Sequence, residues 1–426
     1  MKGDCYQIRE LERGATRCSS DLWPCPGPGP DCNQVVKVPE RSWSRMQHPR
    51  ILFVSTYPPT RCGIATFTRS LLLALAQVRG GADGLAVARI RGRADHSISL
   101  DPEVVVEASA HSPSWHMEVA RAETGFDVVW IQHEFGIFGP GSGHRLLDLC
   151  EAVKRPIVAT LHTVLLEPTR MEREILERVA GRCERLVVMS QAARERVLTT
   201  HEVDPGKVTV VQHGADEYRR IGVRKREARP IIATWGLLGP GKGIEWGIRA
   251  LAHLRHLRPL PRYHIQGATH PNVLSTEGEA YRNYLRAVAS ELGVTDMVTM
   301  SSDYLSSEQL AREMEEIDIV LLPYDSSVQV TSGVLVEALA AGLPVVATAF
   351  PHAIELLSEG AGRVVPHGNP KAMATALENL LTRPRAMRVA AMAARRIAPD
   401  LRWSSVARRC ELIANQAIAV SHAGVA

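Results

Sequence analysis

The segment from residue 318 to 348 has the residue types and spacing of a binding site for phosphate and hydroxyl groups. Two apolar runs typical of buried strands, Ile319–Leu322 and 345–347, flank a helix expected to begin near Ser332. A helix N-terminus at the carboxyl end of a parallel strand offers unpaired N–H groups to an anion. Glu337, just inside this helix, could accept hydrogen bonds from a polyol. The pattern predicts side-by-side recognition of phosphate and hydroxyls, as a nucleotide-sugar presents them.

A glycine-rich loop at residues 236–243, Gly-Leu-Leu-Gly-Pro-Gly-Lys-Gly, is a second candidate anion site. Glycines let a backbone approach a ligand closely, and Lys242 adds a cation suited to a diphosphate. Gly243 stands where a P-loop needs its Mg²⁺-binding hydroxyl, so we reject a P-loop NTPase. The alternative is a solvated lysine in an ordinary turn. The glycines concerned are Gly236, Gly239, Gly241 and Gly243.

A third candidate loop, residues 58–66, joins the first predicted strand to its helix. Gly63 could let the backbone approach a ligand, and the turn at Thr66 could donate N–H groups to a phosphate. Arg61 adds a cation to the same loop. An ordinary strand–helix connection is the alternative interpretation.

Polar residues follow several predicted strands, where ligands of doubly wound folds bind. In the first half these include Gln132-His133-Glu134, His162 and His213. They are candidates for positioning a substrate, although any single one could equally be a hydrogen-bonded loop residue. We find no Asp-x-Asp pair at a strand end, so no metal site is predicted.

Short apolar runs alternate with helical patterns from residue 50 onward, and they would position these residues. Continuous apolar strands between helices indicate parallel sheets covered on both faces. Two such sets, separated by a polar stretch near residue 220, predict an α/β fold with two Rossmann-like, doubly wound parallel-sheet domains facing a cleft. The predicted strands are 51–55, 85–90, 128–132, 157–161, 186–189 and 208–212, then 231–235, 263–266, 297–300, 319–322, 345–347 and 364–365.

Composition restricts the remaining possibilities. The chain has 426 residues and a net charge of only +4, which gives no case for nucleic-acid binding. No apolar run approaches the roughly 18–20 residues of a membrane span, so we expect a cytoplasmic protein with at most peripheral contact at the inner membrane face. The four cysteines before residue 33 lack a C-x-x-C pair, and we expect all eight to be reduced thiols. Residues 1–47, which include Pro-Cys-Pro-Gly-Pro-Gly-Pro, are interpreted as a disordered or misassigned N-terminal extension.

Together these motifs resemble those of the GT-B glycosyltransferases of the retaining family 4 type, over about residues 50–420. The loop at 236–243 is similar to the family's Gly-Arg-Leu…Lys-Gly donor motif, with Lys242 in the place of the diphosphate lysine. The segment 333–348 resembles the family's Glu-Ala-Met-Ala-x-Gly-x-Pro-Val-Val signature, and Glu337 falls on the second glutamate of its E-x₇-E motif.

The resemblance extends to the first half and to the C-terminus. Gln132-His133-Glu134, followed by Thr160-Leu161-His162-Thr163, is similar to the acceptor-side pair of bacterial α-mannosyltransferases. Trp403-Ser-Ser-Val-Ala resembles the helix that crosses back to the first domain in this family. These similarities imply an acceptor-binding domain at 48–222, a nucleotide-sugar-binding domain at 223–400 and a crossing helix at 401–426.

The resemblance implies transfer of a hexose from a nucleoside diphosphate sugar, such as GDP-mannose or UDP- or ADP-glucose, to a hydroxyl acceptor. Retention of anomeric configuration and independence of metals and other cofactors are expected. A lipid-linked saccharide, a polysaccharide end and a small natural product are the acceptors considered. The implied catalytic residues are His162, Lys242 and Glu337, and Arg61, Thr66, His133 and Glu134 would position acceptor or sugar. Donor binding is assigned to Gly63, Gly236, Gly239, Gly241, Gly243, Gln329, Thr331, Ser332, Gly333 and Val334.

Two residues depart from the family pattern. Gln329 replaces the first glutamate of E-x₇-E, and Leu237 replaces an arginine of the donor loop. Arg61 could partly replace that lost cation. The departures leave a catalytically silent nucleotide-sugar- or glycan-binding partner as an alternative to the enzyme. A sugar-nucleotide epimerase on the same architecture is a third hypothesis, for which Glu134 and Asp325 would be available carboxylates.

Overall fold

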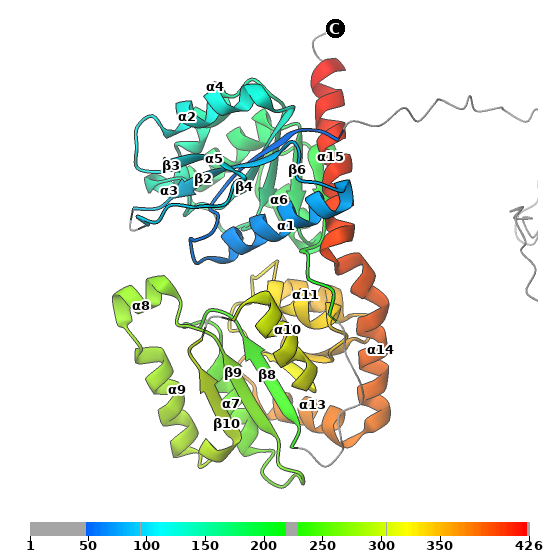
Figure 1. Cartoon of the computed structure of the whole chain (residues 1–426). Helices are drawn as coiled ribbons and strands as arrows, with labels where there is room; N and C mark the ends of the chain where they lie inside the picture. Colours follow the sequence, from blue (N-terminus) through cyan, green and yellow to red (C-terminus); the bar gives the residue numbers. More distant parts are fainter. Residues whose placement is uncertain (1–47, 94, 219–228, 304, 424–426) are drawn as a thin grey trace, which may run out of the picture. The chain divides into compact units, whose positions relative to one another are not determined.

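The computed structural model describes residues 48–423 apart from 94, 219–228 and 304 (Figure 1). The predictions made for residues 1–47, and for the boundary between 222 and 223, therefore lie outside the described residues. In the described part of the chain, no helix combines the length and apolar character needed to cross a membrane. Its four cysteines, Cys62, Cys150, Cys183 and Cys410, are free thiols.

The first domain is built on a seven-stranded parallel sheet in the order β3-β2-β1-β4-β5-β6-β7. The predicted strands of this half are all present, but one strand was missed. That strand, β3, is half-exposed at the sheet edge and carries Glu107, so it lacks the continuous apolar run of the others. The strands are β1 (Ile51–Ser55), β2 (Leu85–Arg91), β3 (Val104–Ser109), β4 (Val128–His133), β5 (Ile157–Leu161), β6 (Arg185–Val188) and β7 (Val208–Val210).

Helices cover both faces of this sheet because β1 is apolar on both sides. Leu52 and Val54 pack in one core with α2, α4, α5 and α6, whereas Ile51 and Phe53 pack in another with α1 and α15. The helices are α1 (Gly63–Arg79), α2 (Trp115–Ala122), α3 (Pro140–Gly143), α4 (Leu146–Ala152), α5 (Arg170–Arg182), α6 (Gln191–Thr200) and the C-terminal α15 (Trp403–Ala423).

The second domain is built on a six-stranded parallel sheet in the order β10-β9-β8-β11-β12-β13, and every strand predicted for this half is present. The strands are β8 (Ile231–Trp235), β9 (Arg262–Gln266), β10 (Val298–Ser301), β11 (Ile319–Leu322), β12 (Val345–Thr348) and β13 (Gly362–Val365). The helices are α7 (Ile244–Ala252), α8 (Pro271–Glu277), α9 (Ala280–Glu291), α10 (Ser307–Glu316), α11 (Gly333–Ala340), α12 (Pro351–Leu357), α13 (Pro370–Thr382) and α14 (Pro384–Leu401).

The same alternation builds the second core. Ile232 and Leu321 pack with α7, α9 and α13 on one face of the sheet, and Ala233 and Val320 pack with α11, α12 and α14 on the other. The two-domain, doubly wound α/β architecture predicted from the sequence is thus confirmed. The C-terminal α15 lies along α1, burying Val406, Cys410 and Ala414 among the residues of that first-domain core (Figure 1).

Candidate active site

A cavity of about 780 Å³ lies at the carboxyl ends of the strands, lined by residues of both domains. This is a typical volume for a small-molecule site. We call its two sides the first-domain wall and the second-domain wall. The first-domain wall comprises residues 61–64, 66, 67, 70, 134, 136, 137, 162, 189, 213 and 214, with Trp403 of α15. The second-domain wall comprises residues 235–237, 242, 266, 267, 270, 271, 303, 305, 310, 331, 333, 334 and 337.

The N-terminus of α11 provides unused hydrogen-bond donors on the second-domain wall. The helix begins where expected because Ser332 is its N-cap, and the Ser332 Oγ accepts a hydrogen bond from Leu335 N. Ser332 N donates to His352 Nδ1 (2.9 Å). Among the described residues no partner contacts the N–H of Gly333 or Val334, and the buried Thr331 Oγ1 also has none. These donors are therefore left for a ligand.

Lys242 brings a cation to the same wall. Its ammonium lies 4.6 Å from the centre of the Tyr324 ring, and it has no carboxylate partner among the described residues. The loop before α7 is held by Asp325, whose N–H donates to Gly241 O (3.0 Å) while its carboxylate accepts from Trp246 Nε1 (2.6 Å). The tertiary structure thus fixes the loop that carries Lys242.

Glycine is required at three positions around this loop. Gly243 is the N-cap of α7 in the left-handed conformation (φ 60°), and a Cβ there would overlap with Pro323 O. A Cβ on Gly267 would overlap with Gly236 O, and both residues have positive φ. The serine or threonine of a P-loop therefore could not occupy position 243 without a backbone shift, which explains the departure from that pattern.

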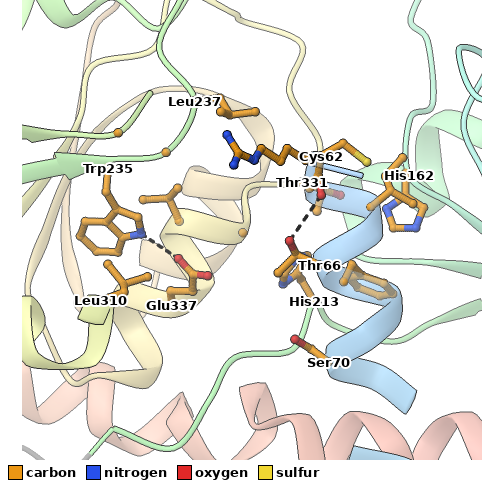
Figure 2. Close-up of a pocket in the computed structure, with 18 of the residues that line it drawn as sticks. Cys62, Thr66, Ser70, His162, His213, Trp235, Leu237, Leu310, Thr331 and Glu337 are labelled. Carbon is orange, nitrogen blue, oxygen red and sulfur yellow. Dashed lines mark hydrogen bonds between the residues drawn. The ribbon is translucent and has the colours of Figure 1, made fainter. Parts of the chain in front are cut away.

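Glu337 places a carboxylate on the second-domain wall. Its Oε2 accepts a hydrogen bond from the indole Nε1 of Trp235 (2.7 Å), as Figure 2 shows. The pKa of Glu337 is raised to about 7, chiefly by burial and to a smaller extent by the carboxylate of Asp216, and the Trp235 hydrogen bond opposes both effects. A group with this pKa changes charge near neutral pH.

On the first-domain wall, His162 is neutral and held in one orientation. Its Nε2 donates to Gln132 Oε1 (2.8 Å), which leaves Nδ1 with a lone pair. The edge of its ring packs against Phe67 at a centroid distance of 4.8 Å. Burial lowers the pKa of His162 to about 3, with smaller contributions from His213 and His133. His162 is therefore suited to accept a hydrogen bond but not to supply a positive charge.

Two neighbouring residues of the sequence, His133 and Glu134, have different surroundings. Glu134 lines the cavity, and its carboxylate accepts hydrogen bonds from Thr163 Oγ1 (2.6 Å) and Phe135 N (3.0 Å). Burial raises the pKa of Glu134. His133 does not line the cavity: it is buried against Phe135, and burial, with His201 nearby, lowers its pKa to about 4.

The loop that precedes α1 is fixed by a buried arginine. Arg89 is fully buried and donates to Tyr57 O (2.9 Å) and Thr60 Oγ1 (2.8 Å), while ion pairs with Asp95 and Glu107 compensate its charge. This network anchors the residues immediately before Arg61, Cys62 and Gly63. Cys62 caps α1 through its Sγ, which accepts from Ala65 N, and the hydroxyl of Thr66 donates to Cys62 O.

The cavity thus brings together most of the residues singled out from the sequence. Those that line it are Arg61, Gly63, Thr66, Glu134, His162, Gly236, Lys242, Thr331, Gly333, Val334 and Glu337. Gly239, Gly241, Gly243 and Ser332 shape the loops behind the wall instead. Gln329 does not line the cavity either, because its amide donates to Thr331 O (2.8 Å). Leu237, the other departure from the family pattern, does line it.

The sequence assigned no role to three lining residues, Asp216, Tyr218 and Trp235, and it marked His213 only as one of several polar residues at strand ends. His213 follows β7, and its position at a strand end was the only signal. Its Nδ1 donates to Gly214 O (2.7 Å), and its ring lies about 3.2 Å from the position of a Cβ on Gly333. A side chain on the first residue of α11 would therefore require the His213 ring to move by a few tenths of an ångström.

Two family models match adjacent parts of the chain. The model described as Glycosyltransferase Family 4 matches residues 63–219, and the model described as Glycosyl transferases group 1 matches residues 217–397. The first match covers α1 to the end of the first domain, and the second covers the sheet of the second domain and most of α14.

Curated relatives are similar over different lengths. An MMP alpha-(1->4)-mannosyltransferase of Mycolicibacterium hassiacum is 29% identical over 336 residues, which are 72% of this chain and 75% of the relative. A D-inositol 3-phosphate glycosyltransferase of Kineococcus radiotolerans is 27% identical over 375 residues, 81% of this chain and 84% of the relative. The same-named protein of Mycobacterium sp. (strain KMS) is 30% identical, but there the chain spans only about half of the relative's length (49%).

Solved structures share the fold. Anabaena Alr3699/HepE, crystallised with UDP and glucose, superposes with a TM-score of 0.66 at 17% identity, covering 85% of this chain and 98% of that one. Sucrose-phosphate synthase of Thermosynechococcus elongatus gives a TM-score of 0.69 at 17% identity, with 87% and 100% covered. The family models, the relatives and the shared architecture agree, and this chain belongs to the GT-B glycosyltransferases of the family 4 type.

Proposed function

We propose that this glycosyltransferase moves a hexose from a nucleoside diphosphate sugar to a hydroxyl acceptor with retention of anomeric configuration and without a metal ion. One observation carries the proposal. The ammonium of Lys242, the unused N–H groups of Gly333 and Val334, and the Glu337 carboxylate line one cavity of about 780 Å³. Cation and N–H donors suit a diphosphate, and the carboxylate suits the hydroxyls of a ribose.

The second-domain wall would stabilise the leaving group. As the bond between sugar and diphosphate breaks, negative charge develops on the diphosphate. Lys242 and the first residues of α11 already line the cavity, so little reorganisation would be needed as this charge appears. In the described part of the chain no cluster of three or more His, Cys, Asp or Glu residues could hold a metal ion. Lys242 and these N–H groups would provide the charge stabilisation.

The first-domain wall would position the acceptor and the transferred sugar. The lone pair of His162 Nδ1 and the carboxylate of Glu134 are hydrogen-bond acceptors for hydroxyl groups. Arg61, exposed at the cavity rim, would supply the cation that Leu237 does not. Arg61→Ala should accordingly weaken donor binding, and unchanged affinity would remove this role.

The name of the M. hassiacum relative supports mannose as the hexose, so GDP-mannose is the first donor to test, with UDP- and ADP-glucose next. The names of the other relatives support a small polyol phosphate among the acceptors to be tested beside lipid-linked saccharides and polysaccharide ends.

The test is a thermal-shift panel of UDP-, GDP-, ADP- and TDP-sugars on the wild type and on Glu337→Ala. A ligand at 100 times its dissociation constant stabilises the folded protein by about 2.7 kcal/mol. A shift with one donor that is lost in the variant identifies the base. That donor is then assayed for transfer and slow hydrolysis with and without EDTA. No binding of any donor would contradict the proposal, and binding without turnover would favour a catalytically silent partner. Loss of activity in EDTA would contradict metal independence.

A further inference from the structure

Trp235 is the last residue of β8, and its side chain separates the cavity from the core of the second domain. Trp235 is 7% exposed and belongs to the same hydrophobic core as Leu335 and Val336 of α11. In Figure 2 it lies beside Leu310, with its nitrogen directed at Glu337. A buried indole N–H requires an acceptor, and here that acceptor is a carboxylate which the cavity also reaches.

The hydrogen bond leaves half of the carboxylate available. Trp235 Nε1 donates to Oε2 of Glu337 at 2.7 Å, whereas Oε1 accepts no hydrogen bond from any described residue. A carboxylate that is held by one oxygen cannot rotate freely, so the direction of the other oxygen is fixed before a ligand arrives. Preorganisation of this kind lowers the cost of binding.

The hydrogen bond from Trp235 is the main contact that favours the ionised form of Glu337, because the other influences on this carboxylate oppose ionisation. Asp216, in the segment that follows β7, raises the pKa of Glu337, as does burial. Tyr218, in the same segment, has its own pKa raised by burial and by both carboxylates, so it remains neutral. Lys242 lines the same cavity from the loop before α7, with its ammonium over Tyr324.

We infer that Trp235 is a positioning residue, whose indole N–H orients the Glu337 carboxylate to accept hydrogen bonds from the ribose hydroxyls of the donor nucleotide. The inference rests on the proposed function for the identity of that ligand. Tryptophan suits the role because it donates one hydrogen bond, carries no charge and has a rigid ring. A lysine or arginine in its place would form an ion pair with Glu337 and compete with the ligand for the second oxygen.

The test compares Trp235→Phe with the wild type by calorimetric titration. The probes are UDP and GDP and their 2′,3′-dideoxy forms, which lack the two hydroxyls. The wild type should bind the ribonucleotide about tenfold more tightly than the dideoxy form, and in Trp235→Phe this preference should largely disappear. Trp130→Phe is the control, because Trp130 Nε1 also donates a hydrogen bond, to Thr160 Oγ1 at 2.8 Å, and Trp130 does not line the cavity. The control should keep the full preference.

The pH dependence gives a readout that a merely structural role would not change. Affinity for the ribonucleotide should fall in the wild type as pH drops through about 7, where Glu337 becomes protonated. Without the indole N–H the pKa of Glu337 rises, so this fall should occur about one to two pH units higher in Trp235→Phe. Raising the pH should then restore part of the lost affinity. If Trp235→Phe does not fold, Trp235→Tyr also lacks a donor at that atom and replaces it.

The outcomes separate this inference from the proposed function. If the wild type binds neither ribonucleotide, the proposed function fails, and the inference fails with it. If the wild type binds one of them and Trp235→Phe keeps both the ribose preference and the pH profile, only the inference is overturned. A uniform loss of affinity for both forms of the nucleotide would also overturn it, because that result indicates general damage to the wall.

Discussion

The two walls of the cavity differ in how their polar groups are paired. On the first-domain wall, His162 is bonded to Gln132, Glu134 to Thr163, and His213 to Gly214. On the second-domain wall, Lys242 has no carboxylate partner, and the N–H groups of Gly333 and Val334 have no acceptor among the described residues. These polar side chains of the first-domain wall are hydrogen-bonded within the protein, whereas these donors of the second-domain wall remain available to a ligand.

The difference is one of charge as well. Burial holds the pKa of His162 at about 3 and that of His213 at about 4, so both rings are neutral at pH 7. Apart from Arg61, the first-domain wall therefore offers hydrogen-bond acceptors and aromatic rings, which suit a neutral polyol. The second-domain wall offers a cation and aligned N–H groups, which suit an anion. The asymmetry matches a reaction in which an anion leaves on one side and a hydroxyl attacks from the other.

Acidification should have the largest effect, and on the first domain. His133, His162 and His213 all have a pKa lower in the folded protein than the unfolded value of 6.5. Below pH 6.5 the unfolded state therefore binds more protons, so stability must fall as pH drops toward 4. Each group contributes up to about 1.4 kcal/mol per pH unit. Denaturant unfolding at pH 7, 5.5 and 4.5 measures the slope.

His133→Asn isolates one of these contributions, and it should flatten the dependence by up to about 1.4 kcal/mol per pH unit. His253→Gln, at an exposed position, is the control variant. Glu337 works in the opposite direction. Its raised pKa means that the folded state binds more protons between pH 4.5 and 7, so its contribution to stability falls as pH rises through that window. Equal slopes in His133→Asn and the wild type would show that this ring is not kept neutral by burial.

Lys242→Ala should have the next largest effect, and on the second domain. If the ammonium stabilises the leaving diphosphate, turnover should fall at least tenfold, by up to about 3 kcal/mol of barrier. The folded stability should change little, because Lys242 forms no ion pair with any residue that the structure describes. Steady-state kinetics with saturating donor measure the effect, and Lys371→Ala on the exposed surface of α13 is the control. Turnover at the wild-type rate would mean that the cation of this wall serves another purpose.

Replacing glycines in the loop at residues 236–243 should lower the stability of the folded protein without changing the charge of the second-domain wall. Gly241 and Gly243 both have positive φ, but a Cβ on Gly241 meets nothing within 4 Å, whereas one on Gly243 overlaps with Pro323 O. Both alanine variants should lose about 1–2 kcal/mol from the left-handed backbone. Gly243→Ala should lose clearly more and should also bind nucleotide less well, because the overlap displaces the start of α7. Thermal melts compare the pair directly, and equal losses would show that the Pro323 contact relaxes without cost.

The sequence predicts the second-domain wall better than the first for a physical reason. The N-cap at Ser332, the carboxylate one turn later at Glu337 and the glycines around Lys242 are local features, so their geometry follows from neighbours in the chain. The first-domain wall depends on which face of a strand a side chain occupies. Gln132 and His133 alternate on β4, and only the tertiary structure shows that Gln132 reaches His162 while His133 is buried beside Phe135.

Trp235 illustrates the same limit within the second domain. It ends an apolar run that reads as an ordinary buried strand, and its partner Glu337 lies 102 residues further along the chain. Gln329 shows a different limit, in which the decisive contact is local. Its amide donates a hydrogen bond to the carbonyl of Thr331, two residues away. That local bond competes with the contact to the donor sugar that the family pattern implies, and nothing in the residue types reveals it.

The smallest predicted effect tests how His162 of the first-domain wall acts on the acceptor. It asks whether the orientation of the neutral ring matters, rather than a positive charge. Gln132→Leu removes the acceptor of His162 Nε2 and lets the ring rotate, so turnover should fall about fivefold while the affinity for the donor nucleotide stays the same. Gln132→Glu keeps an acceptor at the same position but raises the pKa of His162. It should therefore retain the orientation at high pH and lose activity as pH falls and the ring becomes charged. Transfer assays across pH, paired with nucleotide titrations, separate the two variants. A change in nucleotide affinity in Gln132→Leu would show that the two walls are coupled, and the division between an orienting wall and a charge-stabilising wall would then have to be abandoned.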